Sequence, residues 1–204
     1  MHKTQMIGMV ACTLAAAGQA AHATVINFDT FPNSAPVPDT TVILAQYAAL
    51  GVTFSSPAPA GGPTAAVLVG EASSAPNGLY GLQGGAGLAP ITIDFASPLS
   101  SSVSMVLLSV GDATVTATAY ASDLSTVIDS VSLTHGPSAG NGFGNQDPIT
   151  LNGPGITRVF VRITATGPVQ DGFGIDDLGF DPVPAPGVAL PLGASWLALV
   201  RRRR

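Results

Sequence analysis

The sequence predicts an all-β protein, an antiparallel β-sandwich of jelly-roll-like form (residues 24–181), between a signal peptide (residues 1–23) and a tail with a short C-terminal hydrophobic helix (residues 182–204). The body carries short apolar runs with polar residues at alternate positions, which is typical of strands. Glycine (24) and proline (17) make up about a fifth of the 204 residues and cluster between these runs. Only 9% of the residues are charged, against about 25% in ordinary domains, so bundles of Glu/Lys-rich helices are excluded.

The N-terminus has the features of an export signal in their usual order. Lys3 supplies a positive charge, and residues 6–17 form an apolar run that is too short to span a bilayer. Ala21 and Ala23 place small side chains at the two positions that signal peptidase requires. We therefore expect cleavage after Ala23 and a mature chain that begins at Thr24. A buried N-terminal helix is the weaker alternative.

The single cysteine, Cys12, lies inside the signal, so the sequence offers neither a disulfide framework nor a cysteine metal site. A lipoprotein signal that uses Cys12 is disfavoured because the apolar run continues beyond it. In residues 24–181, twelve acids stand against two bases, a net charge of −10. A nucleic-acid partner is excluded because its phosphates need the opposite sign.

Ten strands are expected in the body, separated by clusters of glycine and proline such as residues 57–63, 84–87 and 140–144. A helical turn is expected only near Thr41–Leu50. The expected strands are Thr24–Phe28, Gly51–Phe54, Ala66–Val69, Ile91–Phe95, Val103–Val110, Thr114–Ala121, Thr126–Thr134, Ile149–Leu151, Arg158–Ala165 and Phe173–Phe180.

The C-terminal tail has three parts. Residues 181–187 are rich in proline, which ends both helix and sheet. Residues 188–200 carry no charge and would form a helix of about 20 Å, against a bilayer core of about 30 Å. The chain then ends in Arg201, Arg202, Arg203 and Arg204, and an apolar run before a basic cluster is a stop-transfer pattern. A C-terminal core strand or helix with an unrelated basic tail is the alternative.

These three parts together resemble the PEP-CTERM sorting signal of Gram-negative bacteria. The family motif is Val-Pro-Glu-Pro, and this sequence has Ala185 in place of Glu. The resemblance implies recognition by an exosortase in the inner membrane, with the protein anchored there before processing and at the cell surface or outside the cell afterwards. The matching residues are Val183, Pro184, Ala185 and Pro186.

The body also resembles PEP-CTERM ectodomains. The runs 24–29, 47–54 and 115–120 are similar to strands of that family, and residues 171–180 are similar to its closing strand. This last motif also recurs at the end of jelly-roll carbohydrate-binding modules and adhesion domains. The resemblance implies a β-sandwich that is displayed outside the cell.

Asp171, Asp176, Asp177 and Asp181 form the one dense acidic cluster. Aspartates are unfavourable inside an apolar strand, and carboxylates with backbone carbonyls suit Ca²⁺. Strand alternation would place Asp176 on the face of Leu178 and Phe180, and Asp177 on that of Ile175, so that one of the two points partly into the core.

The resemblance to jelly-roll modules implies a structural calcium held by Asp29 of the first strand with Asp176 and Asp177 of the last. The alternative is that the two adjacent acids hydrogen-bond backbone groups at strand ends.

We find little catalytic chemistry in the sequence. His135 stands in a turn without a nucleophile motif, the single glutamate is Glu71, and Arg158 and Arg162 are interpreted as partners of surface aspartates. The prediction is a non-catalytic exported protein that supports exopolysaccharide-linked adhesion or biofilm. A lectin-like carbohydrate-binding module is the alternative, and a secreted hydrolase is a weaker one. Candidate sugar-stacking residues are Tyr47, Tyr80, Tyr120 and Phe143.

Overall fold

The computed structural model describes residues 23–57, 61–66, 71–81, 89–136, 142–166 and 172–182. Residues 21–183 form one compact unit. Ala21, the sorting motif from Val183 onwards, the arginine cluster and Asp171 lie outside the described residues. Within the ranges above, no helix is long and apolar enough to cross a bilayer.

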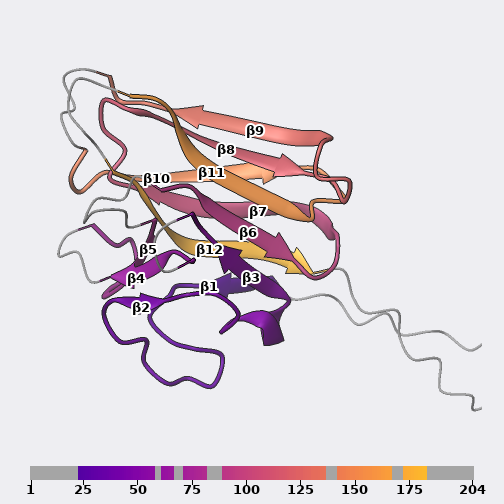
Figure 1. Cartoon of the computed structure of the whole chain (residues 1–204), viewed down its shortest axis with the longest axis horizontal. Coiled ribbons are helices and arrows are strands. Elements are labelled where there is room, and N and C mark those ends of the chain that lie inside the picture. The colour runs from indigo at the N-terminus through magenta and orange to yellow at the C-terminus, as the bar shows by residue number, and fades with distance from the viewer. Residues whose placement is uncertain are drawn as a thin grey trace, which may run out of the picture. The chain divides into compact units, whose positions relative to one another are not determined.

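The strands form two antiparallel sheets, one of seven strands and one of five, which lie face to face (Figure 1). The seven-stranded sheet has the order β10-β7-β12-β5-β4-β2, and β1 also pairs with β12. Its strands are β1 (Thr24–Ile26), β2 (Thr41–Val42), β4 (Thr64–Ala66), β5 (Gly78–Tyr80), β7 (Leu99–Leu108), β10 (Gln146–Asn152) and β12 (Gly174–Pro182).

The five-stranded sheet has the order β3-β6-β11-β8-β9. A three-residue 3₁₀ helix, Ala48–Leu50, precedes its first strand. The strands of this sheet are β3 (Val52–Ser55), β6 (Ile91–Phe95), β8 (Thr114–Tyr120), β9 (Val127–Leu133) and β11 (Arg158–Ala165).

Apolar side chains from both sheets fill the space between them. In β6 and β11 alternate residues such as Ile93 and Val161 are fully buried, while their neighbours face outward. From the opposite sheet, Val103 and Leu107 of β7 and Ile175 of β12 join the same cluster. This alternation is the reason why one side of the five-stranded sheet is apolar and the other side is polar.

The prediction of an all-β protein built from antiparallel sheets is confirmed. Two short strands, β2 and β5, were not predicted, because two or three residues are too few to show an alternating pattern. The helical turn expected at Thr41–Leu50 consists of β2 and, at its end, the 3₁₀ helix. β7 begins at Leu99, four residues before the expected Val103, since its first residues are mostly serine.

Candidate functional site

The two edges of strand β12 are paired differently. Along one edge, β7 pairs with it from Gly174 to Pro182. Along the opposite edge there are two partners: β5 pairs with Gly174 and Ile175, and β1 pairs with residues 178–180. Asp176 and Asp177 therefore lie in the gap between β5 and β1. We call this place the acidic gap, and define it by Asp29, Asp176 and Asp177.

A bulge at the acidic gap interrupts the alternation of β12. Asp177 has a φ of 49°, and the register against β7 shifts between Asp176 and Gly179. As a result Ile175, Leu178 and Phe180 all lie in the core, and Asp176 is fully buried. The expected placing of Ile175 on the opposite side of the strand from Leu178 and Phe180 is wrong, because a bulge adds a residue and so reverses the side on which later residues fall.

Asp176 is completely buried, and donors from the segment before β5 surround its carboxylate. Its Oδ2 accepts hydrogen bonds from the Ser74 backbone N–H (2.8 Å) and from Ser73 Oγ (3.0 Å). Ser74 Oγ lies 3.2 Å from Oδ1 and 3.1 Å from Oδ2, and the Asp177 N–H donates to Oδ1 at 2.8 Å. Burial raises the pKa of Asp176 to about 6, although these donors and their partial positive charge act in the opposite direction.

Asp29 and Asp177 complete the acidic gap. Ser73 Oγ also lies 2.9 Å from Asp177 Oδ2, so its single proton is shared between the two neighbouring carboxylates. Asp29 Oδ1 accepts the Asn77 N–H at 2.8 Å. Burial raises the pKa of Asp29, the bond from Asn77 opposes this, and the negative charge of Asp177 raises it further. The structure thus brings the predicted residues of the first and last strands to one place.

The acidic gap does not form a calcium cage as its residues are placed. Among the described residues, no group of three or more His, Cys, Asp or Glu side chains is arranged to hold a metal ion. The Asp176 oxygens already accept four protein donors, as the hydrogen-bonding alternative expects. One buried acceptor beside the gap has no hydrogen-bond donor. Asn77 Nδ2 donates to the Phe28 and Val37 carbonyls, whereas Asn77 Oδ1 has no partner. Calcium binding stays a prediction.

Asp181 is the other member of the sequence cluster that the structure describes. It lies near the end of β12 and accepts a hydrogen bond from Ser101 Oγ of β7 at 3.0 Å. The serines that surround Asp176 were missed in the sequence, because they precede it by about a hundred residues and carry no motif.

The outward side of the five-stranded sheet, which we call the outer face, is a second candidate site. Strand register aligns its side chains in rows across β8, β11, β6 and β3. Hydroxyl groups link neighbouring strands, with Thr116 Oγ1 2.8 Å from both Ser132 Oγ and Thr164 Oγ1. The two central rows are Tyr120, Arg158, Asp94 and Thr53, followed by Thr118, Phe160, Thr92 and Ser55.

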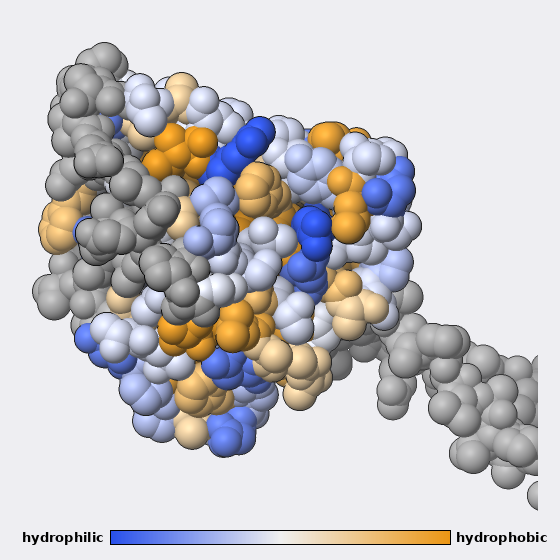
Figure 2. Space-filling model, viewed as in Figure 1, coloured by the Kyte–Doolittle hydropathy of each residue, from blue (hydrophilic) through white to orange (hydrophobic). Residues whose placement is uncertain are grey.

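Two arginines flank one aromatic ring along β11 on this face. Arg158 Nε donates to Asp94 Oδ1 at 2.6 Å, and this bond raises the pKa of Arg158. Arg162 Cζ lies 5.6 Å from the centre of the Phe160 ring, within reach of a cation–π contact. Figure 2 shows this side of the molecule, where strongly hydrophilic patches alternate with weakly polar and apolar residues over β11 and β6. Phe160 had not been singled out, although alternation in Arg158–Ala165 places it between the arginines.

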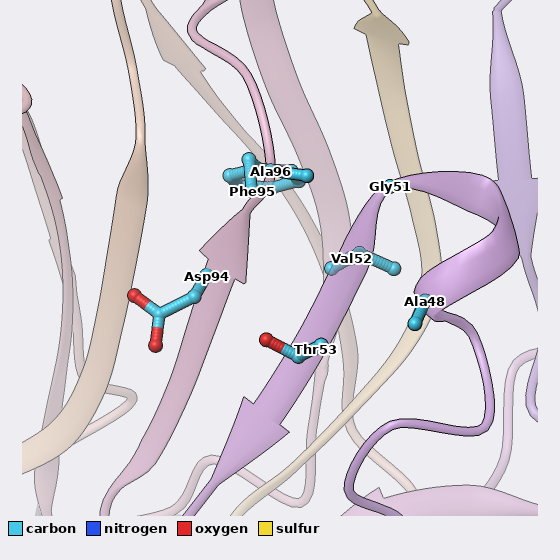
Figure 3. Close-up of a pocket in the computed structure, with 7 residues that line it drawn as sticks. All are labelled: Ala48, Gly51, Val52, Thr53, Asp94, Phe95 and Ala96. Atoms are coloured by element: carbon cyan, nitrogen blue, oxygen red, sulfur yellow. The ribbon is translucent and has the colours of Figure 1, made fainter.

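A small pocket of about 150 Å³ lies at one end of the outer face. Asp94 of β6 and Thr53 of β3 are register partners, and their polar side chains project on the same side of the two strands (Figure 3). The remaining lining residues are Ala48, Gly51, Val52, Phe95 and Ala96. The pocket gives the flat sheet a hollow beside the Arg158–Asp94 pair.

Two of the four predicted sugar-stacking residues are wrong. Tyr47 is 1% exposed, packs edge-on against Phe28 and Phe54, and donates to the Thr30 carbonyl at 3.0 Å. Burial raises its pKa to about 12. Tyr80 is 2% exposed, and its ring packs over Gly78 of β5 and Gly174 of β12 in its own, seven-stranded sheet. These are structural residues, and no ligand reaches them.

Tyr120 and Phe143 remain accessible. Tyr120 is half-buried at the edge of a row of the outer face, beside Arg158. Phe143 is 61% exposed in a turn before β10, in the other sheet. Only Tyr120 of the original four candidates therefore lies on the outer face.

The residues considered for catalysis from the sequence, His135 and Glu71, have separate hydrogen-bond partners. His135 Nε2 is 2.9 Å from Asp147 Oδ2, and within the described ranges its ring has no other hydrogen bond. The expectation of a solvent-exposed loop histidine is confirmed. Glu71 is buried, and Tyr80 Oη donates to its Oε2 at 3.4 Å.

No known protein family and no curated protein matches this sequence. Some solved structures are similar to it at low identity and low structural overlap. The cleaved K2 adhesin domain of Lys-gingipain has 15% identity and a TM-score of 0.49, over 78% of this chain and 99% of that chain. A family 29 carbohydrate-binding module has 11% identity and a TM-score of 0.38, over 78% and 88%. A CBM29-2 mutant complexed with mannohexaose has 12% identity and a TM-score of 0.40, over 78% and 91%. We therefore argue the function of this chain from its own residues.

Proposed function

We propose that this protein is an exported, non-catalytic β-sandwich that binds polysaccharide at the cell surface or in the extracellular matrix, and so supports adhesion or biofilm. The observation that carries the proposal is the outer face. There a sheet surface about four strands wide combines Phe160 and Tyr120 with a lattice of hydroxyl, guanidinium and carboxylate groups.

This combination suits the chemistry of a sugar chain. Sugar rings present apolar C–H faces, which pack on aromatic rings, and hydroxyl edges, which bond polar side chains. Arg158 and Asp94 form a rigid pair that can donate on one side and accept on the other. The pocket at Thr53 and Asp94 could seat a single ring or a branch of the chain.

A binding role also agrees with the arrangement of candidate catalytic groups. A hydrolase needs two carboxylates across a cleft, with the acid close to the bond that it cleaves. Among the described residues, Asp94 forms an ion pair with Arg158, and Glu71 is buried beside Tyr80 of the seven-stranded sheet. The sorting part of the proposal is supported by the tail, where an exosortase would act on residues 183–186 after export.

The experiment is affinity electrophoresis of the purified protein in gels that contain exopolysaccharide extracted from cells that make it. We expect retardation of the wild type, and loss of most of that retardation in Phe160→Ala. Phe143→Ala is the matched control, since it removes an exposed aromatic ring from another part of the molecule. Equal mobility of all three proteins with and without polysaccharide would contradict the proposal.

A further inference from the structure

Positive charge in the body is confined to one strand. Residues 24–181 contain twelve acids and only two bases, Arg158 and Arg162. Both bases lie on β11 and point to the outer face. Arg158 is neutralised by Asp94. Within the part of the chain that the structure describes, Arg162 has no carboxylate partner, so the outer face carries an uncompensated positive charge on a strongly acidic body.

The Arg162 side chain is exposed. Its Cζ lies 5.6 Å from the centre of the Phe160 ring, within reach of a cation–π contact. A contact of this kind engages the charge of the guanidinium and needs no hydrogen-bond acceptor, so its N–H donors stay available to a ligand. Those donors match the two oxygens of a carboxylate, and hydrogen bonds between ionised groups are about twice as strong as neutral ones. Thr116, the register partner of Arg162, adds a hydroxyl beside it.

We propose that the outer face selects anionic polysaccharides that carry carboxylate groups, such as uronate chains, and that Arg162 binds the carboxylate. This inference rests on the proposed polysaccharide-binding function and specifies its ligand. The negative net charge of the body repels a polyanion over the rest of the surface. An anionic polysaccharide is therefore directed to the outer face, where Arg162 has no carboxylate partner among the described residues. A neutral sugar chain could form only the weaker hydrogen bonds with the same groups.

The test compares retardation of the purified protein in gels that contain polygalacturonate, neutral dextran or dextran sulfate. We expect the strongest retardation with polygalacturonate, and a weakening as salt concentration rises. Arg162→Gln should weaken binding to polygalacturonate about tenfold and leave any binding to dextran unchanged. Thr150→Glu is the matched control, because it lowers the net charge by the same amount at an exposed position of β10 in the other sheet.

The outcomes separate this inference from the proposed function. Equal loss of binding in Arg162→Gln and Thr150→Glu would mean that only net charge matters, and would overturn the inference. Equal or stronger binding to dextran sulfate would overturn the preference for carboxylates. Binding to dextran alone would overturn the inference and leave the proposed function standing. No retardation in any of the gels, nor in gels of native exopolysaccharide, would overturn both.

Discussion

Asp176 is a carboxylate with no exposed surface, and four donor groups of the protein surround it. Burial disfavours its ionised form, while the donors favour that form. Burial is the larger effect, because the pKa is raised to about 6 instead of lowered. A group of this kind makes the stability of the fold depend on pH.

The pKa of Asp176 predicts a loss of stability between pH 4 and pH 6. In the unfolded chain the carboxyl has a pKa of about 4. Between that value and about 6, the folded protein holds a proton that the unfolded chain has released. The contribution of Asp176 is therefore fully present below about pH 4, is lost as pH rises, and stays lost above about pH 6. The difference amounts to on the order of 3 kcal/mol.

The measurement is the free energy of unfolding in urea at a series of pH values. Asp176→Asn has no charge to lose, so we expect its stability to lack this downward slope relative to the wild type. Asp39→Asn is the control, since it neutralises an exposed acid away from the gap and should follow the wild type. A constant difference between wild type and Asp176→Asn across this range would show that Asp176 does not titrate there.

Calcium at the acidic gap is the prediction that depends most on resemblance. If Asp29, Asp176 and Asp177 bind the ion, chelator should lower the melting temperature of the purified protein. Ca²⁺ should then restore it, while Mg²⁺ should not. An excess of calcium a hundredfold above its dissociation constant would stabilise the fold by about 2.7 kcal/mol. Asp29→Ala should abolish the response. A melting temperature that chelator leaves unchanged would assign the three carboxylates to hydrogen bonding alone.

At the scale of the elements, β12 organises the seven-stranded sheet. It pairs with β7 along one edge and with both β5 and β1 along the other. The glycines of this region allow close packing as well as turns. A Cβ at Gly174 would meet the Tyr80 ring, with Cδ1 at 2.6 Å and Cζ at 2.9 Å. A Cβ at Gly78, two residues before Tyr80 on β5, would meet the same ring at 2.9 Å.

Gly174→Ala should therefore destabilise the fold by about 1–3 kcal/mol, the usual range for overpacking. The Tyr80 ring is buried, so it cannot swing out of the way without losing its packing. A double-mutant cycle with Tyr80→Leu checks the cause, because a smaller side chain should make the alanine less harmful. Thermal unfolding of the four proteins gives the coupling. Additive effects would mean that Gly174 is needed for a reason other than the Tyr80 ring.

Most of the fold could be predicted from alternation. The bounds of β11 agree with the expected Arg158–Ala165, since Val159, Val161 and Ile163 recur at every second position, although the apolar Phe160 lies between them on the outward side. Alternation failed at Asp177, where a positive φ reverses the pattern, and at Tyr80, where two strand glycines make room for an aromatic ring. Those glycines were a usable signal, because glycine inside a strand marks close approach of another group.

The candidate sites were predictable in part. β1 pairs with β12, and Asp29 lies near enough to Asp177 for the charge of Asp177 to raise the pKa of Asp29, while a shared calcium stays a prediction. The donors from Ser73 and Ser74 depend on contacts between distant segments, which local patterns do not contain. Arg158 pairs with a surface aspartate as interpreted, whereas Arg162 lies within cation–π distance of the Phe160 ring.

At the scale of the whole molecule, the chain separates its charges. The body is strongly acidic, and all the remaining bases, Lys3 and Arg201–Arg204, stand at the two ends. If the body is exported, as we propose, the positive-inside rule would keep the charges at both ends on the cytoplasmic side.

The arginine cluster gives the last prediction. If it acts as a stop-transfer anchor, Arg201–Arg204 should remain in the cytoplasm while residues 183–186 emerge outside the inner membrane. Thirteen uncharged residues are short for a membrane span, so the four charges have to contribute much of the retention. Replacing all four arginines with serine should release unprocessed protein into the periplasm, and fractionation followed by mass spectrometry would detect it. Replacement with lysine keeps the charge and should keep the anchor. Unchanged membrane association and processing in the serine variant would show that the cluster does not hold the protein in the membrane.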